Sequence, residues 1–223
     1  MVRSMNGSDY RGKLILQEFI PGGDDAMRVL NSYSDTDGTV RAMCLGQPVL
    51  EYYDPKSAGN YAAILSAPEV NDAALLERMR AFLEDVQWEG FANFDMKYDP
   101  RTGEYKLFEM NPRQGRSSYF VTAAGYNLAK WLVEDVLEHK AQGLTIADSE
   151  SLWMIAPYGV LLLYLKDKAL LAQAARLKQQ GRCAHQLFCK EDFSMKRWLW
   201  YLRSQLNYYR KTARYYGNKG LKD

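Results

Sequence analysis

The sequence has no apolar run long enough to cross a membrane. Its most apolar stretch, residues 152–165, is interrupted by Pro157, Tyr158 and Gly159, and it is shorter than the roughly 20 apolar residues that a spanning helix needs. The first residues, MVRSMNGSDYRGK, have no apolar centre of the kind that marks a secretory signal peptide. We therefore expect a cytoplasmic protein.

Cysteine is also scarce, with three among 223 residues. An odd number argues against the disulfide framework of a secreted domain. Cys183, His185 and Cys189 follow a C-x-H-x3-C spacing, but a structural zinc site usually has four ligands, and the fourth would have to come from distant Cys44 or His139. We expect buried or partly exposed thiols instead of a zinc site.

The signatures of covalent catalysis are missing too. The chain has no G-x-S-x-G elbow and no base beside a serine or cysteine. Low-complexity segments are absent, and 47% hydrophobic with 25% charged residues is typical of a globular protein with one substantial core. Candidate chemistry therefore lies in positioned polar and charged side chains.

Residues 91–115, FANFDMKYDPRTGEYKLFEMNPRQG, contain the clearest functional pattern. Alternation around Asn93 and Asp95 predicts a strand, DPRTG is turn chemistry, and YKLFE predicts the returning strand. In such a hairpin Asp95 and Glu109 face each other across the ladder, and Asn111 lies on the same face as Glu109. Three oxygen-bearing side chains are thus expected to converge.

The expected set of oxygen ligands suits Mg2+. Proteins usually hold this ion with one or two carboxylates, while ATP phosphates and water complete its shell. Arg113 offers a planar fork for a phosphate or carboxylate and would neutralise charge during phosphoryl transfer. The alternative is an acidic hairpin with solvated carboxylates, which is the usual state of a lone Asp or Glu.

The run EMNPRQGRSSYFVTAAG, residues 109–125, resembles the final metal-binding motif of the ATP-grasp superfamily, especially its carboxylate-amine ligases and its carbamoyl-phosphate-synthase-like members. The chain looks most like the D-aspartate ligase type, which joins an amino acid to a peptidoglycan precursor. The resemblance covers roughly residues 14–139. It implies that the motif and the upstream acid bind Mg2+, or Mn2+ in its place, through Asp95, Glu109 and Asn111. Arg113 would contact the transferring phosphate or an acyl phosphate, with Arg116 as a weaker companion.

A second segment, LILQEFIPGGDD at residues 14–25, resembles the adenine hinge of that family, a strand followed by a Pro-Gly-Gly turn. The resemblance implies contacts to the base, to the ribose hydroxyls and to the purine face. The implied residues are Gln17, Glu18, Phe19 and Ile20 for the base, Asp24 or Asp25 for the ribose, and Phe108 for the purine face. Taken alone, the segment fits better a buried strand followed by an ordinary hydrophilic turn.

The family's glycine-rich loop over the phosphates, with its accompanying lysine, has no counterpart in this sequence. Only residues 1–13 precede the hinge segment, which is too few for the subdomain that carries them. The resemblance therefore implies a truncated ATP-grasp domain. Such a chain is expected to be weakly active or inactive alone, and to need a partner chain that supplies the other half of the site.

Helical spacing predicts the remaining organisation. Residues 72–86 form an amphipathic helix with a capping residue before it, and a second helix is expected from Ser117 or Ser118 to about residue 138. Two further helices are expected over residues 166–180 and 194–211. The expected fold is α+β, with a mainly antiparallel sheet flanked by helices in a partial ATP-grasp domain, residues 1–142, and a helical extension, residues 143–223.

The last predicted helix is strongly basic. From residue 194 onward the chain has eight Lys and Arg and one acid, a net charge of +7, whereas the whole chain has +2. Leu199, Leu202, Leu206 and Tyr209 form an apolar stripe on it. Contact with an anionic surface is one interpretation, nucleic acid is a weaker candidate, and a helix packed on its own domain with solvated basic residues is the plainer alternative.

Together these features predict an ATP- and Mg2+-dependent, amide-forming ligase acting on small-molecule or peptide carboxylates and amines. The substrate carboxylate would be activated as an acyl phosphate. One alternative is another ATP-grasp enzyme that uses bicarbonate, a carboxylase or carbamoyl-phosphate-forming subunit. The other is a binding module without enzymatic activity.

Overall fold

The fold of the chain centres on one mixed β-sheet. A computed structural model describes residues 16–52, 59–140, 142–188, 191–192 and 194–216. Within them the strand order is β5-β4-β1-β2-β3-β7-β8, and β6 pairs with β2 off this path. The strands are β1 (Met27–Ser34), β2 (Val40–Glu51), β3 (Tyr61–Ser66), β4 (Gly90–Asp99), β5 (Glu104–Asn111), β6 (Thr145–Ile146), β7 (Ser151–Met154) and β8 (Cys183–His185).

The sheet is mainly antiparallel, as expected. From β5 to β7 along this path, every neighbouring pair of strands is antiparallel. The parallel pairs in the described residues are β7 with β8, at the end of the path, and β2 with β6. Sequential hairpins join β1 to β2 and β4 to β5. The expectation of an α+β fold with helices around such a sheet is confirmed.

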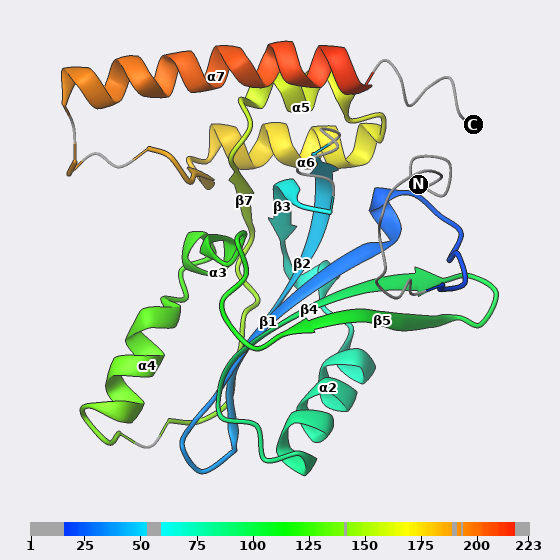
Figure 1. Cartoon of the computed structure of the whole chain (residues 1–223), viewed down its shortest axis with the longest axis vertical. Coiled ribbons are helices and arrows are strands. Elements are labelled where there is room, and N and C mark those ends of the chain that lie inside the picture. Colours follow the sequence, from blue (N-terminus) through cyan, green and yellow to red (C-terminus); the bar gives the residue numbers. More distant parts are fainter. Residues whose placement is uncertain (1–15, 53–58, 141, 189–190, 193, 217–223) are drawn as a thin grey trace, which may run out of the picture.

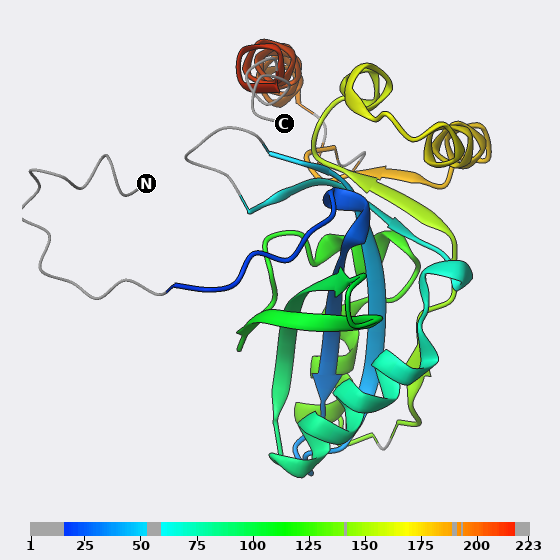
Figure 2. The same cartoon turned by 90° about the vertical axis from the view of Figure 1, so that its right-hand side faces the viewer.

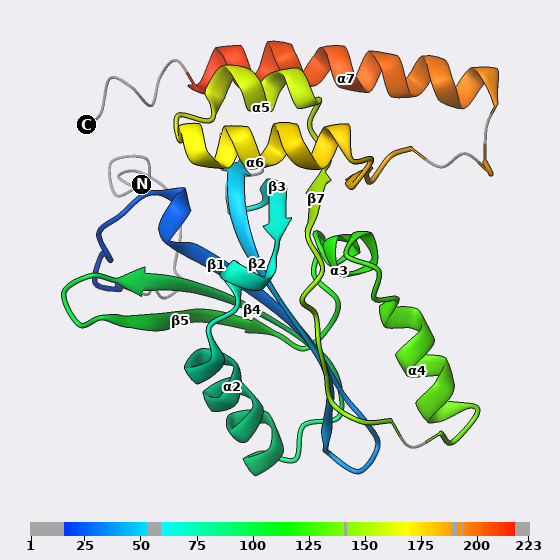
Figure 3. The ribbon, with the colours of Figure 1, turned by 180° about the vertical axis from the view of Figure 1, so that it is seen from behind.

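Helices flank the sheet and cover one end of it. They are α2 (Ala73–Asp85), α3 (Tyr119–Ala123), α4 (Leu128–Val136), α5 (Tyr158–Tyr164), α6 (Lys168–Gln179) and α7 (Met195–Tyr216), with short 3-10 turns η1 (Asp24–Ala26) and η2 (Pro68–Val70). In Figures 1 and 3 the long strands run between α2 on one side and α4 on the other. Helices α5, α6 and α7 lie together at the opposite end of the molecule.

Local signals explain the well-predicted helices. The Asp72 side chain accepts a hydrogen bond from the Leu75 amide at 2.9 Å and starts α2. Asp167 caps α6 in the same way through the amides of Ala169 and Leu170. Along α2, Leu75, Leu76, Met79 and Leu83 are buried, whereas Phe82 and the following Val86 are exposed.

The single helix expected from Ser117 or Ser118 to about residue 138 is wrong, because the segment forms two helices, α3 and α4. Gly125 has φ +95°, a left-handed conformation that ends the first helix. The Asn127 side chain then accepts from the Ala129 amide and starts the second. The Ser118 hydroxyl does not cap α3 and instead bonds the Asn31 side chain at 2.6 Å.

The segment from residue 143 is not purely helical, which corrects the second expected domain. It contributes β6, β7 and β8 to the sheet that β1–β5 form. The sheet therefore contains strands from both sides of residue 142, the expected domain boundary. Leu152, Trp153 and Met154 are buried in β7. A short, continuously apolar run has no periodicity that distinguishes a buried strand from a buried helix, so the sequence pattern did not predict β7.

The strand expected within residues 14–25 is also wrong over its described part, since residues 16–22 form no strand; Leu14 lies outside the described residues. The carbonyls of Ile20 and Gly22 accept hydrogen bonds from the Lys97 ammonium group instead of from a neighbouring strand. Phe19 is 79% exposed, so the plainer alternative of a buried strand is excluded as well.

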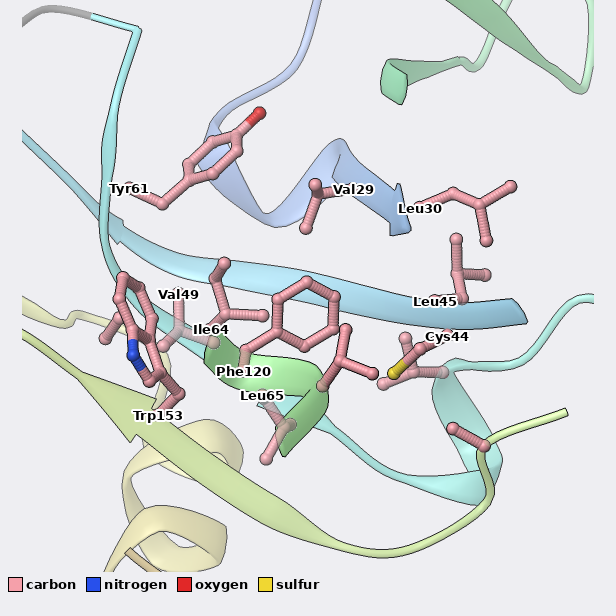
Figure 4. Close-up of a cluster of buried hydrophobic side chains, with 14 of the residues drawn as sticks. Val29, Leu30, Cys44, Leu45, Val49, Tyr61, Ile64, Leu65, Phe120 and Trp153 are labelled. Carbon is pink, nitrogen blue, oxygen red and sulfur yellow. The ribbon is translucent and has the colours of Figure 1, made fainter. Parts of the chain in front are cut away.

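The core lies between the sheet and its helices. Figure 4 shows one part of it, where Phe120 from α3 packs with Ile64 and Trp153 from the neighbouring strands. Burying a large apolar side chain stabilises the fold by roughly 1.5–3 kcal/mol. Tyr61 lies at the edge of this cluster with its hydroxyl pointing away from it (Figure 4).

None of the helices in the described part of the chain is long and apolar enough to span a bilayer.

Candidate functional site

The hairpin of β4 and β5 brings the three predicted oxygen ligands together. Asp95 pairs with Glu109 and Asn93 pairs with Asn111 across the ladder, so these four side chains stand on one face. A bulge follows, because Met96 pairs with Leu107 and leaves one residue unpaired. The predicted facing arrangement of Asp95 and Glu109 is therefore present in the fold.

A pocket of about 300 Å3 opens over this face. Three segments form its wall, namely the start of β3, the β4–β5 hairpin and the loop that follows β5. The lining residues are Gly59, Asn60, Tyr61, Asn93, Asp95, Glu109, Asn111, Arg113, Gly115, Arg116 and Ser117. Five of the residues singled out in the sequence thus share one pocket.

The pKa of Asp95 is perturbed by its surroundings in the pocket. Burial raises the pKa of its carboxyl above the usual range, the negative charge of Glu109 raises it further, and the hydrogen bond from Tyr61 opposes both effects. That bond runs from the Tyr61 hydroxyl to Oδ1 of Asp95 at 2.8 Å. Two carboxylates held side by side favour a cation between them.

The donor set fits a hard divalent ion. Asp95 and Glu109 offer carboxylate oxygens, and Asn111 adds an amide oxygen, which are the ligands that Mg2+ prefers. Among the described residues no three His, Cys, Asp or Glu side chains gather at one place, so the third ligand here is an amide rather than an acid. Two carboxylates leave the remaining positions for phosphate oxygens and water.

Two arginines border the ligand set. Arg113 is exposed, and its guanidinium donates to the Asn111 side-chain oxygen at 3.1 Å and to the Gln114 carbonyl at 3.0 Å. Arg116 lies over the ring of Tyr52, with its guanidinium carbon 5.3 Å from the ring centre. Both therefore place positive charge at the pocket, where an anionic ligand would replace part of their present contacts.

The described hinge residues do not line the pocket, and hydrogen bonds hold their segment against β4. Lys97, two residues along β4 from Asp95 and on the same face, donates to the Ile20 carbonyl at 2.9 Å and to the Gly22 carbonyl at 2.6 Å. Two residues before Ile20, Glu18 forms an ion pair at 2.5 Å with Arg101 in the turn of the β4–β5 hairpin. The hinge backbone is thus brought near the metal ligands.

The remaining predicted nucleotide contacts are more dispersed. Gln17 and Phe19 are exposed, and the Phe19 ring lies 5.3 Å from the Lys97 ammonium nitrogen. Asp24 and Asp25 begin η1, at the edge of the site rather than in its wall. Phe108 is the unpaired residue of the bulge in β5; it is exposed and does not line the pocket.

The predicted set omitted Tyr61, Asn93 and Gly115, which line the pocket, and Lys97, which binds the hinge backbone. Asn93 alternates with Asp95 along β4, so its position on the ligand face was readable from the strand pattern. Gly115 packs on it so closely that a Cβ would lie 2.9 Å from the Asn93 side chain. Tyr61 and Lys97 had no comparable signal, because their contacts join segments far apart in the sequence.

The cysteine and histidine residues that the structure describes do not line this pocket. Burial raises the pKa of the Cys44 thiol to about 12. Cys183 is partly buried in β8, burial lowers the pKa of nearby His185, and Cys189 lies outside the described residues. A thiol held protonated in this way is a poor nucleophile.

Comparison with known proteins supports the motif of residues 109–125. The chain is 44% identical to a D-aspartate ligase of Enterococcus faecium (strain Aus0004) over 212 residues, which are 93% of this chain and 50% of that protein. The similarity to this ligase therefore extends over nearly the whole chain. It spans about half the length of the curated ligase that it matches.

Two further comparisons are more limited. A stretch of 87 residues, 36% of this chain, is 33% identical to the carbamoyl phosphate synthase large chain of Methanobrevibacter smithii (strain ATCC 35061 / DSM 861 / OCM 144 / PS) and covers 8% of it. A solved phosphoribosylaminoimidazole carboxylase ATPase subunit from Aquifex aeolicus is similar over 61% of this chain and 38% of that subunit, with 13% identity and a TM-score of 0.46. No family model matches the chain.

Proposed function

We propose that the chain carries the metal- and phosphate-binding part of an ATP-dependent carboxylate-amine ligase. The observation that supports this most directly is the shared pocket of Asp95, Glu109 and Asn111 with Arg113 and Arg116 beside them. A solvated acidic hairpin does not account for this arrangement, since Asp95 is largely buried and hydrogen-bonded. The likeness to a D-aspartate ligase supports the same reaction class.

In this proposal the pocket aligns reactants and stabilises charge. Asp95, Glu109 and Asn111 would hold Mg2+, and the bound ion would lower the charge repulsion at the ATP phosphates. A substrate carboxylate oxygen attacks the terminal phosphorus and ADP leaves, which gives an acyl phosphate. An amine then attacks the acyl carbon, loses a proton and displaces phosphate, forming an amide. Arg113 donates to the phosphoryl oxygens through both steps.

The hinge would receive the adenine. Lys97 holds the carbonyls of Ile20 and Gly22 beside β4, two residues along the strand from Asp95. The roles of Gln17, Glu18 and Phe19 toward the base, and of Asp24 or Asp25 toward the ribose, are part of the proposal. Phe108 would need to turn toward the pocket to meet the purine, and a side chain in an exposed bulge is free to do so.

We infer the substrates from the relative. D-aspartate is the proposed carboxylate, in keeping with the name of the ligase to which the chain is similar. The proposed amine, that of a peptidoglycan precursor, comes from the resemblance of the motif at residues 109–125. Because the chain spans about half of that relative, a full site would take residues from outside the matched half. Another segment or a second chain could supply them, and the matched half alone is expected to turn ATP over slowly.

The proposal is tested by supplying the missing contacts. The unmatched half of the E. faecium ligase is added as a separate polypeptide, with Mg2+, ATP, D-aspartate and a precursor peptide, and ADP and new amide are measured. Product should form with the pair. Glu109→Gln should lower its rate by about 100-fold or more, whereas Glu104→Gln on the same strand should have little effect.

Two results would overturn the proposal. If Glu109→Gln formed product as fast as the unsubstituted chain, the proposed metal site would have no role in the reaction. Bicarbonate supporting ADP release where D-aspartate does not would instead favour a carboxylase or a carbamoyl-phosphate-forming enzyme, the class to which the shorter sequence match points.

A further inference from the structure

Helix α7 carries three distinct faces along its 22 residues and contains no acidic side chain. The first face packs on the protein. The Tyr201 ring lies 5.2 Å from that of His185, Gln205 is buried, and the Tyr208 hydroxyl is hydrogen-bonded to that of Tyr52. These positions follow helical spacing and account for the attachment of α7 to the fold.

The second face is an apolar stripe turned away from the fold. It consists of exposed side chains spaced every three or four residues, namely Met195, Leu199, Leu202, Leu206 and Tyr209. Leu199 and Leu206 are 58% and 62% exposed. A stripe of this length on a solvent-facing helix is unusual for a surface that meets only water.

The third face is basic. Lys196, Arg203 and Arg210 lie on the far side of the apolar stripe from the packed face, and none of them has an ion-pair partner among the described residues. Arg197, which lies nearer the packed face, forms an ion pair with Asp192. Trp200, 55% exposed, lies beside the basic face.

We propose that α7 binds the surface of an anionic lipid bilayer, lying parallel to it with the apolar stripe in the headgroup region. Charge complementarity selects this occupant. The apolar stripe suits the acyl-chain boundary of a bilayer, and the neighbouring unpaired Lys and Arg suit its anionic headgroups. Trp200 lies beside the basic face, and Trp is common at the level of the headgroups. A second copy of the chain would bring two basic faces together, which repel.

The position of α7 allows this contact. Figure 1 shows it as the outermost element at its end of the molecule, and Figure 2 views it end-on beside α5 and α6, with the sheet on one side. Helices α2 and α4 lie at the opposite end. A flat surface can therefore reach the stripe without meeting the rest of the fold.

Vesicle sedimentation with the full chain tests the proposal. Phosphatidylglycerol vesicles should bind the chain, and phosphatidylcholine vesicles should bind it weakly. Each Lys or Arg near an anionic surface strengthens binding about fivefold. The variant K196A/R203A/R210A should therefore bind phosphatidylglycerol on the order of 100-fold more weakly, and L199S/L206S should bind at least about tenfold more weakly.

The charge-matched control is R78A/K130A/K140A, whose residues lie on or next to α2 and α4. It should bind within about threefold of the wild type. All substituted side chains are exposed, so circular dichroism and the thermal midpoint should be unchanged.

Several results would overturn the proposal. An equal loss in the control variant would show diffuse charge attraction, and unchanged binding by L199S/L206S would show a contact that does not use the stripe. Absence of binding to phosphatidylglycerol at low salt would exclude the surface directly. A dimer in solution that L199S/L206S dissociates would assign the stripe to self-association.

Discussion

The hydroxyl of Tyr61 donates a hydrogen bond to Oδ1 of Asp95 at 2.8 Å, although β3 and β4 are not neighbours in the sheet. Strands β1 and β2 lie between them, and three strand spacings in a flat sheet amount to about 14 Å. The sheet must therefore curl at this point. Register shifts in β2 between Pro48 and Glu51 supply the bend.

This bond predicts that Tyr61→Phe loosens the metal site. Loss of the donor should lower the free energy of unfolding by about 1 kcal/mol, and should weaken Mg2+-dependent nucleotide binding by roughly three- to tenfold because Asp95 is less well oriented. Calorimetric titration measures the affinity. Tyr126→Phe is the control, since it removes a 2.8 Å hydrogen bond to Asp148 outside the pocket, and it should leave the nucleotide affinity unchanged.

Asp95→Asn is expected to stabilise the protein at neutral pH while removing metal binding. Burial raises the pKa of Asp95 in the folded state, so the folded protein holds this proton more tightly than the unfolded chain. Its contribution to stability is therefore present at low pH and is lost as pH rises through the folded-state pKa. Without metal, the variant should gain about 0.5–2 kcal/mol at pH 7.

The pH dependence provides the check. The gain of Asp95→Asn should vanish below the pKa of the unfolded carboxyl, and added Mg2+ should raise the thermal midpoint of the wild type alone. Asp37→Asn, at an exposed acid, should show neither effect. A variant less stable than the wild type at pH 7 would contradict the electrostatic account of this site.

Gly115→Ala should displace the loop that carries Arg113 and Arg116. The added Cβ would lie 2.9 Å from the buried Asn93 side chain, and overpacking of this kind costs about 1–3 kcal/mol. Thermal denaturation should show that loss together with weaker nucleotide binding. Gly143→Ala meets no atom within 4 Å, and a similar loss there would show that the effect does not come from the contact with Asn93.

Lys97→Met should release the hinge segment from β4. Two hydrogen bonds from a charged donor to the Ile20 and Gly22 carbonyls are lost, and such bonds contribute about 1.5–3 kcal/mol each. Proteolysis within residues 16–23 should become faster, and nucleotide affinity should fall by about tenfold. Lys106→Met, across the ladder from Lys97, should change neither the proteolysis rate nor the nucleotide affinity. The same changes in that variant would show that general loss of positive charge is responsible.

The sequence predicted those parts of the site that depend on neighbouring residues. The facing of Asp95 and Glu109 follows from a hairpin register set by its own turn, and α2 follows from its cap at Asp72 and its apolar spacing. Both require only local pairing or periodicity. Asn111 and Arg113 lie two positions apart in the sequence, so their place in one pocket also depends on local geometry.

The parts that failed depend on distant contacts. Tyr61 reaches Asp95 because β2 bends, and no pattern near residue 61 records that bend. Lys97 binds the hinge carbonyls in place of the expected strand pairing. The break at Gly125 was present in the sequence, but helical spacing on both sides of it concealed the end of α3.

The central claim is that Asp95, Glu109 and Asn111 hold a divalent cation together with the phosphates of ATP. Calorimetric titration of the chain with a non-hydrolysable ATP analogue, with and without Mg2+, tests it most directly. We predict binding that requires Mg2+ and that Glu109→Gln and Asn111→Ala each weaken by at least about tenfold. Binding of equal strength without Mg2+, or unchanged in both variants, would contradict the claim.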